Sequence, residues 1–287
     1  RELAHERWRE LTRRDELSYY GVLAARRLGT TPWRPAAAAD SLPVPTDMRE
    51  ALARAATLEE LGMVLEERLE YDELARLAGS DPARLLATAA ALQARELSSR
   101  GIRLAARARD RGAAEDARLL RRLYPVVHGD VLAAESRERG LDPALVAGLI
   151  RQESNFEPRA TSPAGARGLM QIMPRVGTAI ARGMSFPVWD TALLWEPDVN
   201  LRLGAAHLAT LVREYDRLEH VLAAYNAGES RVRRWRERRG ADDPELFTER
   251  IPYPETRDYV RLVLRNRDLY RALYGWRAPD GAQQSGR

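Results

Sequence analysis

The stretch DPALVAGLIRQE at residues 142–153 decides the fold class, because it carries the local signals of a helix that buries one face. Asp142 can cap the helix N-terminus, and Pro143 suits its first turn. Three apolar residues and a glutamate follow the helical spacing i, i+3, i+4 and i+7 and so form one stripe along the helix: Val146, Leu149, Ile150 and Glu153. We therefore predict a helix over 142–153 that packs against a core.

Glu153 occupies the last position of this stripe, near the C-terminal end of the helix. Burial disfavours a carboxylate, and so does the negative end of the helix dipole. Both effects raise the pKa of the carboxyl toward neutral pH, where a general acid works best. The alternative is a surface glutamate whose side chain turns into water, and this helix by itself leaves that alternative open.

Helical signals also fill the rest of the chain, and no stretch alternates β-branched and polar residues as a strand would. Asp81 and Pro82 open a helix that we expect to reach Leu97. Thr57 with Glu60 predicts a capping box at another helix start. Three glycines are expected to end helices: Gly79, Gly101 and Gly112. The predicted fold class is all-α, with roughly seven short helices before residue 124.

A change of composition divides the chain. Residues 1–125 predict stacked helical hairpins, a superhelix or linker region that a proline-rich crossing loop at 31–45 interrupts. After residue 125 Gly, Asn, Trp and Tyr become frequent, so we place a second domain at 126–275. We expect residues 276–287 to form a tail, because Gly, Gln and Ser dominate there.

Composition excludes several classes of protein. A chain of 287 residues that is 45% apolar can bury substantial cores, and the absence of cysteine excludes disulfides and thiolate metal sites. No apolar run approaches the roughly 20 residues of a membrane span. The first residues, RELAHER, do not resemble a signal peptide, so we expect none. All 46 basic residues are arginine, but the net charge of +4 gives only a mild attraction to anionic polymers.

Later segments combine polar side chains with tight turns. SPAGARG at 162–168 is a loop whose glycines allow a close backbone approach, and LMQIMP at 169–174 resumes apolar structure around one amide. AYNAG at 224–228 ends a helix with a phenol beside an amide. Taken singly, these segments are also explained as a buried turn and an ordinary helix C-terminus.

Taken together, the segments resemble one enzyme family. Glu153-Ser154, GLMQIMP at 168–174 and AYNAG at 224–228 stand in the order and at the separations of the soluble-type lytic transglycosylases, whose catalytic domain is lysozyme-like. IPYPETRDYV at 251–260 resembles the last motif of that family. LSYYG at 17–21 resembles the end of the α-superhelix that precedes this domain in the large members. The resemblance covers about half of the chain.

The resemblance implies a peptidoglycan lytic transglycosylase with Glu153 as its sole catalytic acid and base. It implies that Glu153 protonates the glycosidic oxygen of the MurNAc-GlcNAc β-1,4 bond, that the acetamido group assists, and that the 6-hydroxyl of the same sugar attacks the anomeric carbon. The product is then a 1,6-anhydroMurNAc end, formed without water. The resemblance also implies residues that bind substrate: Ser154, Met170, Gln171, Met173, Tyr225, Asn226, Glu255 and Tyr259.

Most glycosidases use two carboxylates, so a second acid has to be considered. Asp190, Asp198 and Glu229 are candidates, but none lies in a motif or on an apolar stripe, and we favour solvated positions for all three. Glu255 follows Pro254 and suits a first helical turn equally well, so its role stays open. No histidine pair has the spacing of a zinc helix and no calcium loop occurs, so we predict no metal and no cofactor.

A basic run with one aromatic residue, RVRRWRERR at 231–239, suits nucleic acid or an anionic wall polymer. We favour a solvated helix face with Trp235 packed inward. Trp189 and Trp195 are interpreted as core residues or as sugar-stacking subsites. We expect peptidoglycan glycan strands as the partner, association with the periplasm or cell envelope, and no nucleic acid. Two rival functions stay open: a hydrolytic muramidase on the same fold and a non-catalytic wall-binding scaffold.

Overall fold

The computed structural model describes residues 2–30, 36, 42–184, 186 and 188–277. Within these ranges the chain is all-α, as predicted, and its only extended pairings are isolated bridges. The described residues form two compact units. The smaller unit comprises residues 35–127 with 155–157, and the larger unit comprises residues 1–34, 128–154 and 158–287. No helix within the described ranges has the length and apolarity needed to cross a membrane.

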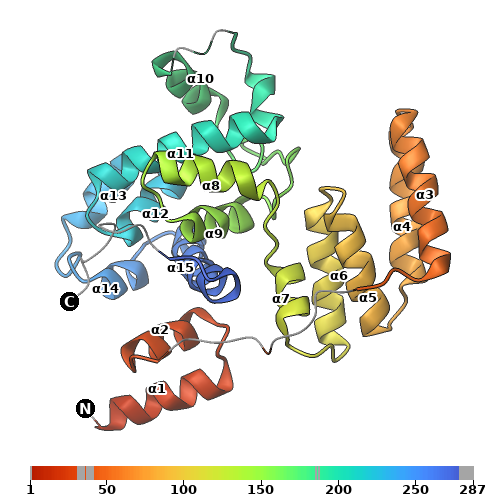
Figure 1. The fold of residues 1–287 in the computed structure, drawn as a ribbon. Helices are drawn as coiled ribbons and strands as arrows, with labels where there is room; N and C mark the ends of the chain where they lie inside the picture. The colour runs from red at the N-terminus through yellow and green to blue at the C-terminus, as the bar shows by residue number, and fades with distance from the viewer. Residues whose placement is uncertain (1, 31–35, 37–41, 185, 187, 278–287) are drawn as a thin grey trace. The chain divides into compact units, whose positions relative to one another are not determined.

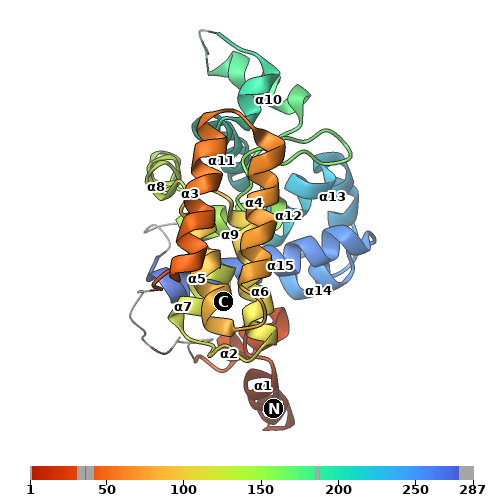
Figure 2. The same cartoon turned by 90° about the vertical axis from the view of Figure 1, so that its right-hand side faces the viewer.

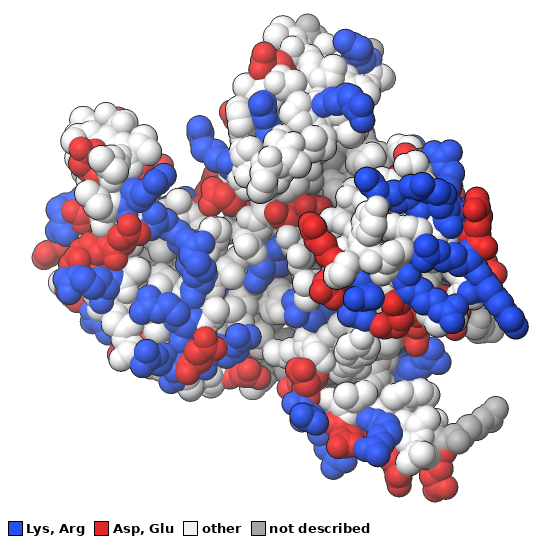
Figure 3. Space-filling view, turned by 180° about the vertical axis from the view of Figure 1, so that it is seen from behind, with Lys and Arg blue, Asp and Glu red and all other residues white. Residues whose placement is uncertain are grey.

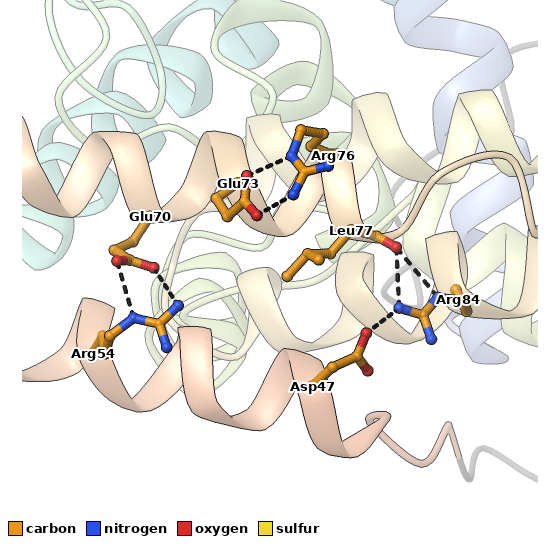
Figure 4. Close-up of polar contacts among 7 residues, drawn as sticks. All are labelled: Asp47, Arg54, Glu70, Glu73, Arg76, Leu77 and Arg84. Carbon is orange, nitrogen blue, oxygen red and sulfur yellow. Dashed lines mark hydrogen bonds and ion pairs between the residues drawn. The ribbon is translucent and has the colours of Figure 1, made fainter.

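The smaller unit consists of helical hairpins (Figures 1 and 2). In chain order its helices are α3 (Thr46–Glu60), α4 (Val64–Leu77), α5 (Pro82–Gln93), α6 (Ser98–Asp110) and α7 (Ala117–Leu123). Helix α3 packs against α4, and α5 packs against α6. Ion pairs fasten the outer layers: Arg54 binds Glu70 across the first hairpin, and Arg84 joins Asp47 to the carbonyl oxygen of Leu77 (Figure 4).

Two sequence predictions for this unit are wrong. Thr57 and Glu60 do not open a helix, because both lie in the last turn of α3, where the Thr57 hydroxyl donates to the carbonyl oxygen of Ala53. Gly101 does not end a helix but lies inside α6, where a Cβ atom would come within 2.5 Å of the Gln93 side chain. The absence of a side chain at Gly101 therefore permits a close approach of α5 and α6. Gly79 and Gly112 do follow helix ends, and Asp81 caps α5 as predicted.

The larger unit holds the remaining helices around α9. These are α1 (Glu2–Arg14), α2 (Tyr19–Arg27), α8 (Gly129–Glu138), α9 (Pro143–Glu153), α10 (Pro174–Gly183), the 3-10 helix η1 (Thr191–Trp195), α11 (Pro197–Glu214), α12 (Leu218–Ala227), α13 (Glu229–Arg236), α14 (Pro244–Glu249) and α15 (Pro254–Tyr274). Helix α9 packs against α15 and α8 (Figure 1). Its central residues from Ala144 to Ile150 are buried.

Helix α9 is fixed at its N-terminus and along its length. The Asp142 carboxylate accepts from the amide of Ala144 at 3.0 Å and pairs with Arg271 of α15 at 2.7 Å. The Asn266 amide donates to the carbonyl oxygen of Gly148 at 3.2 Å. These contacts set the axial position of α9 and so the position of its last residue.

Helices α1 and α2 belong to the larger unit, where α2 packs on α15. Arg26 pairs with Asp268, and the Tyr20 hydroxyl donates to Glu249 at 3.1 Å. The proline-rich stretch at 31–45 and the tail at 276–287, both named in the sequence analysis, lie mostly outside the described residues.

Candidate active site

Glu153 is the last residue of α9, and its side chain is half-buried. The pKa of its carboxyl is raised to about 7; burial is the largest cause, and the nearby charge of Glu255 also raises it. Tyr259 acts in the opposite direction, because its hydroxyl donates to Glu153 Oε1 at 2.6 Å and so favours the carboxylate. Glu153 can therefore release and accept a proton near neutral pH.

Two tyrosines act together with this carboxyl. Burial raises the pKa values of Tyr259 and Tyr225 well above the usual range, and the charge of Glu153 adds to both shifts. Both phenols consequently stay protonated and serve as hydrogen-bond donors. Tyr259 uses its hydroxyl on Glu153, whereas Tyr225 donates to the carbonyl oxygen of Met170 at 2.8 Å. The structure thus brings residues from α9, α12 and α15 to one place.

Ser154 connects α9 to the segment that follows Gly168. Its side chain is buried, and its hydroxyl donates to the carbonyl oxygen of Leu169 at 2.8 Å. The contact is with the main chain and not with the Glu153 carboxylate. Ser154 therefore anchors the 168–173 segment next to the end of α9.

Position 168 requires glycine for two reasons: its backbone is in the left-handed region, and there is no room for a Cβ atom. Its φ is +75°, and a Cβ atom there would lie 2.1 Å from the carbonyl oxygen of Leu194 and 2.2 Å from the Asn200 amide nitrogen. Only glycine fits such a position without displacement of backbone.

The other residues of the 168–173 segment have different environments. Gln171 is in a left-handed conformation, and its amide donates to the carbonyl oxygens of Gly168 at 2.8 Å and Ala160 at 3.2 Å. Met170 is fully buried. Met173 caps α10 and is 40% exposed, so it is the member of this segment that solvent or a ligand reaches most easily.

Asn226 lies in the last turn of α12, and Glu255 lies in the first turn of α15. The Thr256 hydroxyl donates to the Asn226 amide oxygen at 2.7 Å, which ties the end of α12 to the start of α15. Glu255 is exposed and raises the pKa of Glu153 through its charge. All the residues nominated from the sequence therefore lie in the larger unit.

Three residues around the site were not nominated from the sequence. Asn200 is completely buried and holds the 168–173 segment, since its oxygen accepts from the Met170 amide at 2.8 Å and its nitrogen donates to Arg167 and Leu194. The sequence signal that could have identified Asn200 is its position as a polar residue on the apolar face of α11. Thr256 was quoted in a motif only. The His207 ring lies tilted against Tyr225, with the ring centroids 5.1 Å apart.

The candidate second carboxylates have other roles. Asp190 accepts from the amide of Ala192 and caps η1, while Asp198 lies in the first turn of α11. Burial and contact with Glu214 raise the pKa of Glu229. Within the described residues no three His, Asp or Glu side chains are grouped as a metal site would need.

Known proteins share this arrangement of helices. Residues 130–248 match the family model described as the transglycosylase SLT domain. The chain contains an SLT domain. The region matched to the model carries Glu153, Gln171 and Tyr225 but ends before α15 and Tyr259.

Several relatives of this region are named soluble lytic murein transglycosylases, and others are membrane-bound lytic murein transglycosylases. The protein of that name from Salmonella typhimurium is 35% identical over 155 residues, which are 53% of this chain and 24% of the relative. The lytic transglycosylase Slt of Pseudomonas aeruginosa, solved as an inactive mutant, matches with 30% identity and a TM-score of 0.74 over 94% of this chain and 43% of that chain. The 70 kDa soluble lytic transglycosylase of Escherichia coli matches with 24% identity and a TM-score of 0.80, over 98% of this chain and 44% of that one.

These likenesses confirm the predicted family resemblance and the all-α, lysozyme-like fold. The chain spans about a quarter of the length of the Salmonella relative and less than half of each solved chain.

Proposed function

We propose that this protein is a peptidoglycan lytic transglycosylase that cleaves the MurNAc-GlcNAc β-1,4 bond without water and leaves a 1,6-anhydroMurNAc end. The observation that supports this most directly is the Glu153 carboxyl, whose pKa of about 7 suits it to give up a proton and then to take one back. The SLT domain around it and the lytic murein transglycosylases among its relatives supply the substrate class.

In the first step the protonated Glu153 gives its proton to the glycosidic oxygen, and the bond from this oxygen to the anomeric carbon breaks. The acetamido oxygen of the same muramic acid stabilises the positive charge on that carbon. The leaving strand departs with a free hydroxyl, and Glu153 is left as a carboxylate. The Tyr259 hydroxyl stabilises this carboxylate, because it already donates to Oε1 at 2.6 Å.

In the second step the Glu153 carboxylate accepts the proton of the 6-hydroxyl, and the 6-oxygen forms the new bond to the anomeric carbon. The acetamido group is released and the acid form of Glu153 is restored. Each proton that Glu153 donates is recovered, so one carboxyl is sufficient and no second acid is needed. Tyr225 provides a neutral dipole beside the reacting sugar.

The other nominated residues are proposed to position the sugar strand. We propose that Met173 and Asn226 contact it directly, which the exposure of the Met173 side chain and the hydrogen bond from Thr256 to Asn226 support. Ser154 and Gln171 act through the backbone of the 168–173 segment that they hold. Met170 contributes its carbonyl oxygen as the partner of Tyr225.

The functional domain that we propose extends over 126–275, past the end of the region matched to the family model. Helix α15 belongs to it because it carries Tyr259 against Glu153 and packs along α9. With peptidoglycan as the substrate, we expect the protein to act in the periplasm or at the cell envelope.

Mass spectrometry of digested peptidoglycan tests the proposal. We expect muropeptides with 1,6-anhydro ends from the wild type, and loss of at least about a thousandfold in rate from Glu153→Gln, because the proton donor is removed. Glu138→Gln is the matched control, since Glu138 is an exposed carboxylate on α8. Reducing ends would identify a hydrolytic muramidase instead, and full activity of Glu153→Gln would exclude Glu153 as the acid.

A further inference from the structure

An arginine-rich surface lies on α13 and the turn that leads to α14. Figure 3 shows basic side chains gathered on this side of the larger unit. The chain contributes six arginines within nine residues: Arg231, Arg233, Arg234, Arg236, Arg238 and Arg239. Trp235 is buried beneath them, as the sequence predicted for a solvated helix face. The proposed reaction uses none of these side chains.

Part of this surface is a shallow recess that is open to solvent. Its floor is apolar and its rim is basic, and the residues that line it are Trp235, Phe247, Ile251, Ala241, Gly240, Arg238, Arg239 and Arg250. No carboxylate is among these lining residues. We call this site the arginine pocket.

The backbone of the arginine pocket is held in place by hydrogen bonds. The amide of Ala241 donates to the carbonyl oxygen of Arg238 at 3.1 Å, and Arg250 Nη1 donates to the carbonyl oxygen of Arg239 at 2.8 Å. The buried His220 contacts the carbonyl oxygen of Ala241 through Nε2 at 3.2 Å. The backbone at Arg238 and Arg239 is therefore fixed before any ligand arrives, which lowers part of the entropic cost of binding.

The rim charges are not neutralised within the described part of the chain. Arg238 and Arg239 are exposed and make no ion pair there, and Arg250 donates to a carbonyl oxygen, which is uncharged. Of the neighbouring carboxylates, Asp243 caps α14 by accepting from the Leu246 amide at 2.9 Å. Glu237 and Asp242 are exposed and do not line the pocket. Guanidinium groups arranged around an apolar floor favour a planar or tetrahedral oxyanion.

The arginine pocket is connected to the candidate active site through the start of α15. Trp235 packs edge-on against the exposed Tyr253 at 5.4 Å, and Arg231 lies over the same ring at 5.6 Å. Tyr253 is the N-cap of α15, and Tyr259 follows six residues later on the same helix. Six residues of helix rise about 9 Å, so the first turns of α15 link the two sites.

We propose that the arginine pocket binds an oxyanion group, carboxylate or phosphate, carried by the same cell-wall polymer whose glycan strand reaches Glu153. The inference rests on the proposed function for the identity of the polymer. Among these groups we favour the carboxylates of the peptide attached to muramic acid, because this peptide is carried by the sugar at the cleaved bond. The pocket acts on substrate affinity and not on the chemical step.

Direct binding tests the pocket without any need for catalysis. Calorimetric titrations use three probes: the stem peptide released from peptidoglycan, the same peptide with amidated carboxyl groups, and inorganic phosphate. The pocket variant is the double substitution Arg238→Gln with Arg239→Gln. Its matched control is Arg233→Gln with Arg234→Gln, which removes the same charge from exposed positions of α13 outside the pocket.

We expect the stem peptide to bind the wild type and the control alike, and to bind the pocket variant about tenfold more weakly, because charged hydrogen bonds are lost. Amidation of the peptide should have the same effect on the wild type. With soluble peptide-bearing strands as substrate, the pocket variant should raise KM by a similar factor and leave kcat unchanged, whereas peptide-free strands should show no change.

Binding of phosphate but not of peptide would also support an oxyanion pocket and would assign phosphate as its source. Equal weakening in both double variants would overturn the proposal in favour of general charge attraction. No binding of any probe would also overturn it. Failure of the proposed function would instead appear as absent anhydro products, while the titrations would still report on the pocket.

Discussion

The raised pKa of Glu153 predicts a pH-dependent difference in stability between the wild type and Glu153→Gln. The folded protein holds the pKa of this carboxyl at about 7, against a reference value of 4.5. A group whose pKa is raised on folding supports the folded state fully below its unfolded pKa, and that support is lost as pH rises through its folded pKa. Each pH unit across this window costs about 1.4 kcal/mol, so the wild type loses up to about 3 kcal/mol between pH 4 and pH 8.

Glutamine resembles the protonated acid in shape and cannot ionise, so Glu153→Gln escapes this loss. We expect the two proteins to be equally stable near pH 4, and the variant to be more stable by up to about 3 kcal/mol at pH 8. Urea unfolding at pH 4, 6 and 8 measures the difference, with Glu138→Gln as the control whose difference from the wild type stays flat. A difference for Glu153→Gln that does not change with pH, or that favours the wild type as pH rises, would refute the assigned pKa.

Three further predictions concern the surroundings of this carboxyl. Tyr259→Phe removes a donor to the Glu153 carboxylate, so the alkaline limb of wall-lytic activity, followed by turbidity, should move up by about one pH unit. Gly168→Ala should lower the free energy of unfolding by more than about 2 kcal/mol in thermal denaturation, since its Cβ would meet Leu194 and Asn200. Asn200→Ala should cost about 3 kcal/mol in the same assay, because it leaves the buried Met170 amide and the Leu194 carbonyl oxygen without this partner, whereas the Arg167 carbonyl oxygen still accepts from the Ile172 amide.

Local sequence signals predicted a helix well where its own capping residues determine its start. The helix over Pro143–Glu153 has the predicted cap and bounds, because Asp142 and Pro143 satisfy the first turn without help from distant residues. Helix α5 starts after Asp81 for the same reason, although it ends at Gln93 and not at Leu97.

Tertiary packing accounts for the errors. A glycine in a helical sequence is usually taken to predict a helix end. Gly101 instead lies inside α6, because α5 leaves no room for a side chain at this position. The contact between Tyr259 and Glu153 joins residues 106 positions apart, and no local pattern encodes it. The same holds for Asn200, whose three hydrogen bonds reach residues up to 33 positions away.

The combination of burial with one hydrogen bond explains how a single glutamate can perform both proton transfers of the proposed reaction. Burial alone would favour the acid so strongly that Glu153 could protonate a leaving group only at the cost of an unstable carboxylate. The hydrogen bond from Tyr259 alone would lower the pKa and leave too little acid at neutral pH. Because the two effects oppose each other, the pKa stays near 7, where neither the acid form nor the carboxylate is costly to reach. A second carboxylate at this place would raise that pKa again through charge repulsion, as the exposed Glu255 already does. A site with one half-buried acid therefore favours a reaction that returns the proton to its donor.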